Sequence, residues 1–161
     1  MRDNKTRQLC QGAAVAALYV ALTWLSAALG LASGPIQIRL SEALCVLPVF
    51  FSAAVPGLAI GCLLANLLTG AVVLDIVCGA AATLVGALGT RVLRRRPLLC
   101  LLPPVLANAL IVPWVLRYGY GAPDAVWFMA LTVGLGELIA VAGLGSALRS
   151  ALARHLPSLG G

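Results

Sequence analysis

Charged side chains are scarce in this chain. Lys, Arg, Asp and Glu supply 10% of its 161 residues, whereas a typical soluble domain carries about 25%. Hydrophobic residues supply 61%, and the mean hydropathy is +1.03. Several apolar runs exceed the ~18 residues that identify a membrane-spanning helix. This composition excludes an ordinary soluble domain, and we expect residues 1–161 to form a single all-α integral membrane domain.

Histidine is almost absent, and the cysteines follow no metal-binding spacing. His155 is the only histidine. The cysteines, none of them in a C-x-x-C pair, are Cys10, Cys45, Cys62, Cys78 and Cys100. They lie in or beside apolar segments, so we expect free thiols that pack as small hydrophobes. A His/Cys metal site is therefore not expected.

Catalytic and nucleotide-binding motifs are also missing. The sequence contains no G-x-x-x-x-G-K-[ST] loop, no G-x-S-x-G and no H-E-x-x-H. Only scattered single polar groups could serve as nucleophile or base. We therefore expect no enzymatic activity and no cofactor bound by this chain.

The net charge of +6 comes from clusters that separate apolar runs. These clusters are Arg2, Lys5 and Arg7; Arg91 and Arg94 to Arg96; and Arg149 with Arg154. Cytoplasmic loops collect Lys and Arg, so the clusters predict a membrane protein with both termini inside and not a nucleic-acid partner. The predicted helices cover residues 8–31, 41–53, 56–69, 72–91, 98–116 and 125–148. The run 9–31 is longer than a usual signal-peptide core, which favours a retained first helix over a cleaved signal.

The segment after the first helix has a different period. Residues 35–40 alternate apolar and polar side chains, which predicts a short extended piece after a break at Ser33 to Pro35. Ser41 is a suitable N-cap for the next helix. Helices 41–53 and 56–69 are each short for a ~30 Å span, so a helical hairpin broken near Pro56 is expected.

A few polar residues interrupt the apolar helices, and they are the candidate substrate-binding groups. They are Arg39, Glu42, Asn66, Asp75, Asn108 and Glu137. Each has a plainer interpretation: an Arg39–Glu42 ion pair, interhelical hydrogen bonds from the asparagines, or a helix-start charge at Asp75. Glu137 lies about 18 Å into its helix at ~1.5 Å per residue, and a carboxylate at that depth indicates a ligand.

Small residues form a stripe on the first helix. Ala13, Ala17 and Ala21 recur at i, i+4 and i+8, so they share one face where another helix can approach closely. The stripe indicates either ordinary packing within the bundle or a docking face for another subunit.

Three stretches carry a family resemblance: IQIRLSEALCVLPVFF, IGCLLANLLTG and LLPPVLANALIVPWVLRYGYG. Through them the chain resembles the queuosine precursor transporter family, substrate-binding S components of energy-coupling factor (ECF) transporters. The resemblance implies a six-helix bundle that takes up a 7-deazaguanine-type precursor. It also implies partners: a transmembrane coupling subunit, which would dock on the alanine stripe, and two ATPases, which would use the ATP.

Other functions remain open from the residues themselves. The same architecture could bind another vitamin or a nucleobase. A non-transport membrane scaffold is a further alternative, and an intramembrane enzyme is the weakest, because no catalytic pair is found.

Overall fold

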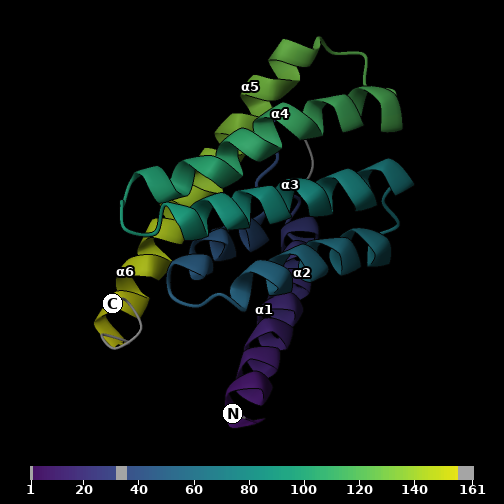
Figure 1. The fold of residues 1–161 in the computed structure, drawn as a ribbon. Helices are drawn as coiled ribbons and strands as arrows, with labels where there is room; N and C mark the ends of the chain where they lie inside the picture. The colour runs from purple at the N-terminus through teal and green to yellow at the C-terminus, as the bar shows by residue number, and fades with distance from the viewer. Residues whose placement is uncertain (1, 32–35, 156–161) are drawn as a thin grey trace.

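The computed structural model describes residues 2–31 and 36–155, and within these ranges every regular element is helical. Figure 1 shows the elements in order. They are α1 Arg2–Ala28, η1 Leu40–Val49, α2 Ala54–Leu68, α3 Val73–Val92, η2 Leu99–Leu101, α4 Leu102–Gly119, α5 Val126–Glu137, η3 Leu138–Gly145 and α6 Ser146–His155. Four helical stretches are long and apolar enough to cross a membrane: Asn4–Ala28, Val73–Val92, Leu99–Gly119 and Val126–Arg154. The expected break at Ser33 to Pro35 lies outside the described residues.

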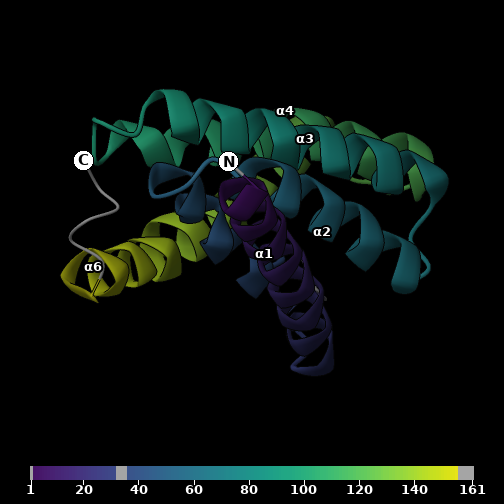
Figure 2. The ribbon, with the colours of Figure 1, turned by 60° about the horizontal axis from the view of Figure 1, so that its bottom comes forward.

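Consecutive long helices pack against each other along the chain. The most extensive contacts join α3 with α4, α1 with α2, α2 with α3 and α4 with α5. Figures 1 and 2 show α2, α3 and α4 as neighbouring helices, and α1 packs against α2. The short elements η1 and η3 pack together in the interior, and η1 also contacts α1 and α3. η1 and η3 therefore meet in the interior of the bundle.

The predicted helix 41–53 is a 3₁₀ helix that ends at Val49. Pro48 explains the departure, because it has no N–H and its ring would clash with the carbonyl four residues earlier in an α-helix. The N-cap interpretation of Ser41 is wrong: no side chain caps this helix, and the Ser41 hydroxyl instead accepts a hydrogen bond from Thr23 at 2.9 Å. A turn at residues 50–53 separates η1 from α2, so the predicted break is present, but Pro56 lies inside the first turn of α2 and not in the break.

The last predicted helix, 125–148, is continuous but changes its winding. Residues Leu138–Gly145 form a π-helix between α5 and α6. Such wide turns are rare and concentrate at functional sites. Glu137 is the last residue of α5, so it lies at the point where the winding changes.

Glycine allows α1 and α2 to approach closely. A Cβ on Gly61 would lie 2.7 Å from the Cβ of Tyr19, and one on Gly57 would lie 2.6 Å from the carbonyl oxygen of Gly12. The buried core around this contact includes Tyr19, Leu58 and Cys62. Close backbone approach through small residues is the usual way in which membrane helices gain packing energy.

Candidate substrate-binding site

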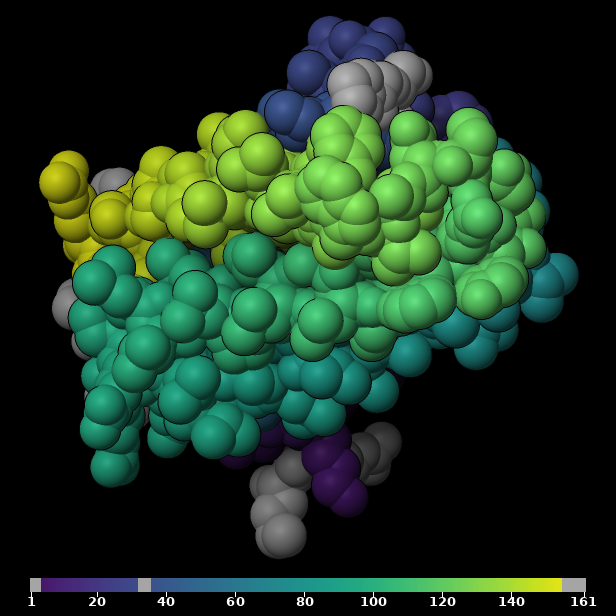
Figure 3. Space-filling view, turned by 90° about the horizontal axis from the view of Figure 1, so that it is seen from above, coloured from purple at the N-terminus to yellow at the C-terminus, as the bar shows by residue number. Residues whose placement is uncertain are grey.

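Three of the predicted site residues line one small cavity in the bundle. Arg39 precedes η1, Asn108 lies on α4 and Glu137 ends α5, and all three contribute to its wall. Gln37, Val112 and Val133 complete the lining. Figure 3 shows α4 and α5 lying side by side along one face of the molecule. The cavity measures about 20 Å³, which is room for about one water molecule.

Two polar atoms in this cavity wall have no hydrogen-bond partner among residues 2–31 and 36–155. They are Nδ2 of Asn108 and Oε2 of Glu137. Both side chains are buried, with 4% and 8% of their surfaces exposed. Leaving a buried polar group unpaired costs about 1–3 kcal/mol, and more for a charged one. These two neighbouring atoms are therefore the candidate contacts for a polar ligand in this cavity.

Arg39 is held in place by Asp75. The nearest guanidinium nitrogen lies 3.9 Å from Oδ2 of Asp75 in the first turn of α3, so this ion pair replaces the Arg39–Glu42 pair considered from the sequence. The hydroxyl of Tyr120 donates a hydrogen bond of 2.8 Å to the same oxygen. Burial and the neighbouring Asp75 carboxylate raise the pKa of Tyr120, so it remains a donor at neutral pH. Oδ1 of Asp75 has no partner.

Glu42 lies in the first turn of η1, and both oxygens of its side chain form hydrogen bonds with other side chains of the protein. One oxygen accepts the hydroxyl of Tyr19, and the other accepts the thiol of Cys45 at 3.1 Å. Glu42 also lies within electrostatic range of both Arg39 and Glu137. It therefore contributes charge to the site, while its hydrogen bonds serve the interior.

Asn66 joins helices at the edge of the site. Its amide nitrogen donates to the backbone oxygen of Asp75 at 3.1 Å, linking α2 to α3. The sequence had offered this role as the alternative to substrate binding. Direct contact of Asn66 with a substrate stays a prediction.

The segment before η1 covers Glu137. A Cβ on Gly136 would overlap the backbone carbonyl of Gln37, so only glycine permits the observed contact. A second cavity of about 150 Å³ lies against Gln37 and Val133. Its other walls include Phe128, Thr132 and Asp124. The two cavities share Gln37 and Val133, so displacement of Gln37 would join them into a larger space.

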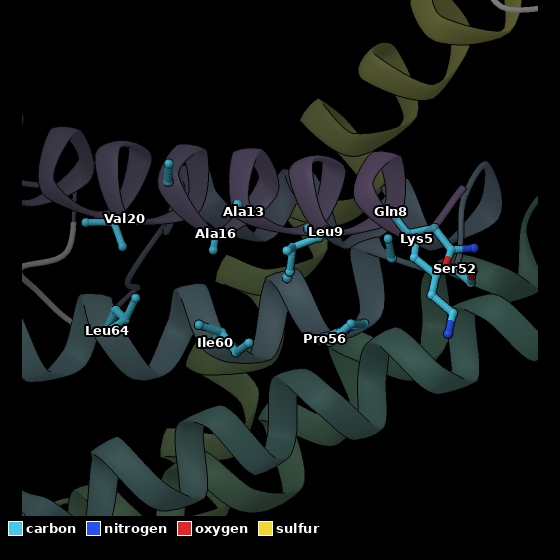
Figure 4. A pocket seen from close by; sticks show the side chains of 14 residues that line it. Lys5, Gln8, Leu9, Ala13, Ala16, Val20, Ser52, Pro56, Ile60 and Leu64 are labelled. Atoms are coloured by element: carbon cyan, nitrogen blue, oxygen red, sulfur yellow. The ribbon is translucent and has the colours of Figure 1, made fainter. Parts of the chain in front are cut away.

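A separate apolar groove runs between α1 and α2 (Figure 4). It measures about 740 Å³, with Lys5, Gln8 and Ser52 at one end and Val20 and Leu64 at the other. Ala13 and Ala17 line it and are exposed, as is Ala21. The alanine stripe therefore faces away from the bundle core.

The sequence did not point to Tyr19, Gly136 or the partner role of Tyr120. Tyr19 carried a usable signal, because a hydroxyl in the middle of an apolar span needs a hydrogen-bond partner. Trp24 and Trp114 are 55% and 51% exposed and belong to the surface.

These features define a polytopic helical membrane protein with a cluster of buried polar residues around a small cavity. Residues 9–154 match the family described as QueT transporter, and the chain belongs to this family. It is 38% identical over 85 residues to a protein of Lactococcus lactis subsp. cremoris named Queuosine precursor transporter QueT. That match covers 53% of this chain and 50% of the relative, so it spans about half the length of each. No solved structure matches the chain. This family and the four apolar helices agree with a multi-pass protein of the bacterial plasma membrane.

Proposed function

We propose that this chain is the substrate-binding S component of an ECF importer and that it captures a queuosine precursor, a 7-deazaguanine derivative or queuine, from outside the cell. The family match and the name of the Lactococcus relative support the cargo. The observation that carries the proposal is the unpaired donor and acceptor of Asn108 and Glu137 in one buried cavity.

The chemistry of this pair suits a deazaguanine ring. The ring edge presents adjacent N–H donors and a carbonyl acceptor. A carboxylate accepts N–H donors, sometimes two at once, and a primary amide donates and accepts side by side. Glu137 would accept from the N–H edge, and Asn108 would donate to a ring acceptor. Both atoms gain the partners that the protein alone does not give them.

The orientation belongs to the same proposal: a single bundle of six helices with both termini in the cytoplasm. Its support is the basic clusters. Arg149 in α6 donates to the carbonyl oxygen of Pro97 at 2.7 Å, which ties the carboxyl-terminal cluster to the α3–α4 connection. The Tyr120 and Gln37 end would then face outside. In this topology η1 and α2 form a short hairpin within the bundle, because ten residues of 3₁₀ helix extend only about 20 Å.

Transport itself would be driven by other chains. A transmembrane coupling subunit and two ATPases would supply ATP hydrolysis, since this sequence carries no phosphate-binding loop. The exposed stripe of Ala13, Ala17 and Ala21 supports α1 as the docking face. The cargo would be moved unchanged, with no chemical step at the site.

The test is calorimetry on the purified protein in detergent. The ligands are 7-cyano- and 7-aminomethyl-7-deazaguanine and queuine, with guanine, riboflavin and thiamine as controls. Tight binding of at least one deazaguanine, together with copurification of ECF subunits from the native membrane, supports the proposal. Binding of a control vitamin or nucleobase alone would assign a different cargo to the same architecture. A folded protein that binds none of these compounds and recovers no ECF subunit would indicate a non-transport scaffold.

A further inference from the structure

The two ends of the groove between α1 and α2 differ in chemistry. Most of its length is apolar, and Leu9 and Ile60 on its walls are 74% and 53% exposed in the described structure. Polar side chains lie at one end only, where Figure 4 shows Lys5, Gln8 and Ser52. The groove therefore offers an apolar channel with a polar, basic end.

The ammonium group of Lys5 has no countercharge among the side chains that the structure describes. The ion pair found among them joins Arg39 to Asp75, and neither residue lines the groove. Arg91 adds a second positive charge near this end, because its guanidinium donates to the last carbonyl oxygens of η1, which leads into Ser52 through a short turn. The polar end of the groove therefore attracts an anion.

The length of the groove matches one leaflet of a bilayer. Lys5 and Val20 lie about 22 Å apart along α1, at ~1.5 Å per residue. Half of a bilayer with its headgroups is about 20–22 Å thick. A cavity of about 740 Å³ over that length has a mean cross-section of about 33 Å², whereas a helix of ~10 Å diameter occupies about 79 Å². The groove therefore fits a slender chain better than a helix.

We infer that the groove of the free protein binds one anionic phospholipid, with the phosphate at Lys5 and an acyl chain along the apolar walls. Basic side chains at the ends of membrane helices attract anionic headgroups. Gln8 and Ser52 supply further hydrogen-bond donors for the phosphate oxygens. The lipid would share Ala13 and Ala17 with the coupling subunit proposed above, so assembly would displace it. This lipid site goes beyond the proposed function and does not depend on it.

The experiment titrates the full, delipidated protein in detergent with phosphatidylglycerol and with phosphatidylcholine of identical acyl chains, and native mass spectrometry counts the bound lipids. We expect one phosphatidylglycerol to bind at least about fivefold more tightly than phosphatidylcholine, the scale of one lysine beside an anionic headgroup. Lys5→Gln should remove this preference. Arg7→Gln is the matched control, because it removes the same charge from an exposed position of α1 outside the groove, and it should keep the preference.

A second pair of variants tests the acyl chain. Ala17→Phe fills the groove and should abolish binding of both lipids, because its ring takes the place of the chain. Ala14→Phe, at an exposed position of α1 that does not line the groove, should leave lipid binding unchanged.

Three outcomes would overturn the inference. Equal affinities for the two lipids, or equal losses in Lys5→Gln and Arg7→Gln, would mean that only the general positive charge attracts lipid. Undiminished lipid binding in Ala17→Phe would place the lipid elsewhere. A dimer of the wild type that Ala17→Phe converts to a monomer would assign the groove to a second copy of this chain. The two charge variants decide the matter where Ala17→Phe fails to fold.

Discussion

The phenolic hydroxyl of Tyr19 donates a hydrogen bond to the carboxylate of Glu42, joining two buried side chains that lie 23 positions apart. Tyr19 lies on α1, and Glu42 lies in the first turn of η1. This bond connects the helix that carries the alanine stripe with the helix that contributes charge to the site.

Removal of that hydroxyl should cost stability. Tyr19→Phe keeps the ring in the core and deletes one of the two donors to Glu42, so we expect a loss of about 1.5–3 kcal/mol, the range for hydrogen bonds to charged groups. A lower apparent Tm in detergent would show it. Tyr118→Phe is the control, because Tyr118 is 74% exposed. An unchanged Tm in Tyr19→Phe would mean that the bond contributes nothing net.

Asn108 should trade stability against affinity. Asn108→Leu replaces a buried amide whose nitrogen has no partner, so the free protein should be as stable as the wild type or more stable. The same change removes the donor available to the ligand and should weaken precursor binding by about 1 kcal/mol, roughly fivefold. Thermal unfolding without ligand and calorimetry with ligand measure the two effects. Reduced stability with unchanged affinity would assign Asn108 to packing.

Gly136 should be intolerant of a methyl group. Gly136→Ala would push the added carbon into the backbone carbonyl of Gln37, so the segment over Glu137 has to shift. We expect weaker precursor binding and a lower Tm. Gly143→Ala is the matched control on the adjoining π-helix, because a Cβ there meets no atom within 4 Å. Equal behaviour of the two variants would contradict the proposed covering role of Gln37.

Arg91 should stabilise η1 from its far end. Its guanidinium donates to the carbonyl oxygens of Pro48 at 2.9 Å and Val49 at 3.4 Å. Arg91→Leu leaves these terminal carbonyls without that donor and should cost about 1–3 kcal/mol of stability. Arg95→Leu, at an exposed position of the same basic cluster, should cost far less. Thermal unfolding of both variants side by side makes the comparison.

The alanine stripe can be tested without touching the site. Ala17→Leu adds bulk to the exposed face of α1 and should reduce recovery of the ECF coupling subunit by affinity purification, because close helix contact needs small residues. Ala14→Leu, also exposed on α1, is the control. Precursor binding by the isolated chain should be unchanged in both. Normal assembly in Ala17→Leu would move the docking face elsewhere.

The sequence was sufficient for the features that depend on composition. It predicted an all-helical membrane protein, the hairpin break before α2, and a set of polar residues from which the structure brings Arg39, Asn108 and Glu137 to one cavity. These predictions worked because charge in an apolar helix is costly and therefore conspicuous. The long-range partner of Arg39 was not predictable, because Asp75 is nearby only after α3 packs against the start of η1.

The winding of the helices escaped sequence reasoning for a different reason. η1 is apolar after Glu42 and η3 is apolar throughout, so hydrophobic periodicity cannot distinguish 3.0, 3.6 or wider turns there. Pro48 was the one local signal for η1. For Glu137, its depth could be estimated from the sequence, whereas its place at the start of a π-helix could not.

A 3₁₀ helix is also a longer helix. The ten residues of η1 extend about 20 Å at ~2.0 Å per residue, whereas an α-helix of the same residues extends about 15 Å. Any rewinding of η1 toward α geometry would therefore draw its Glu42 end and its Arg91-bound end about 5 Å closer together. Rewinding of this one ten-residue helix would thus shift the residues at both ends of η1 relative to each other by about 5 Å.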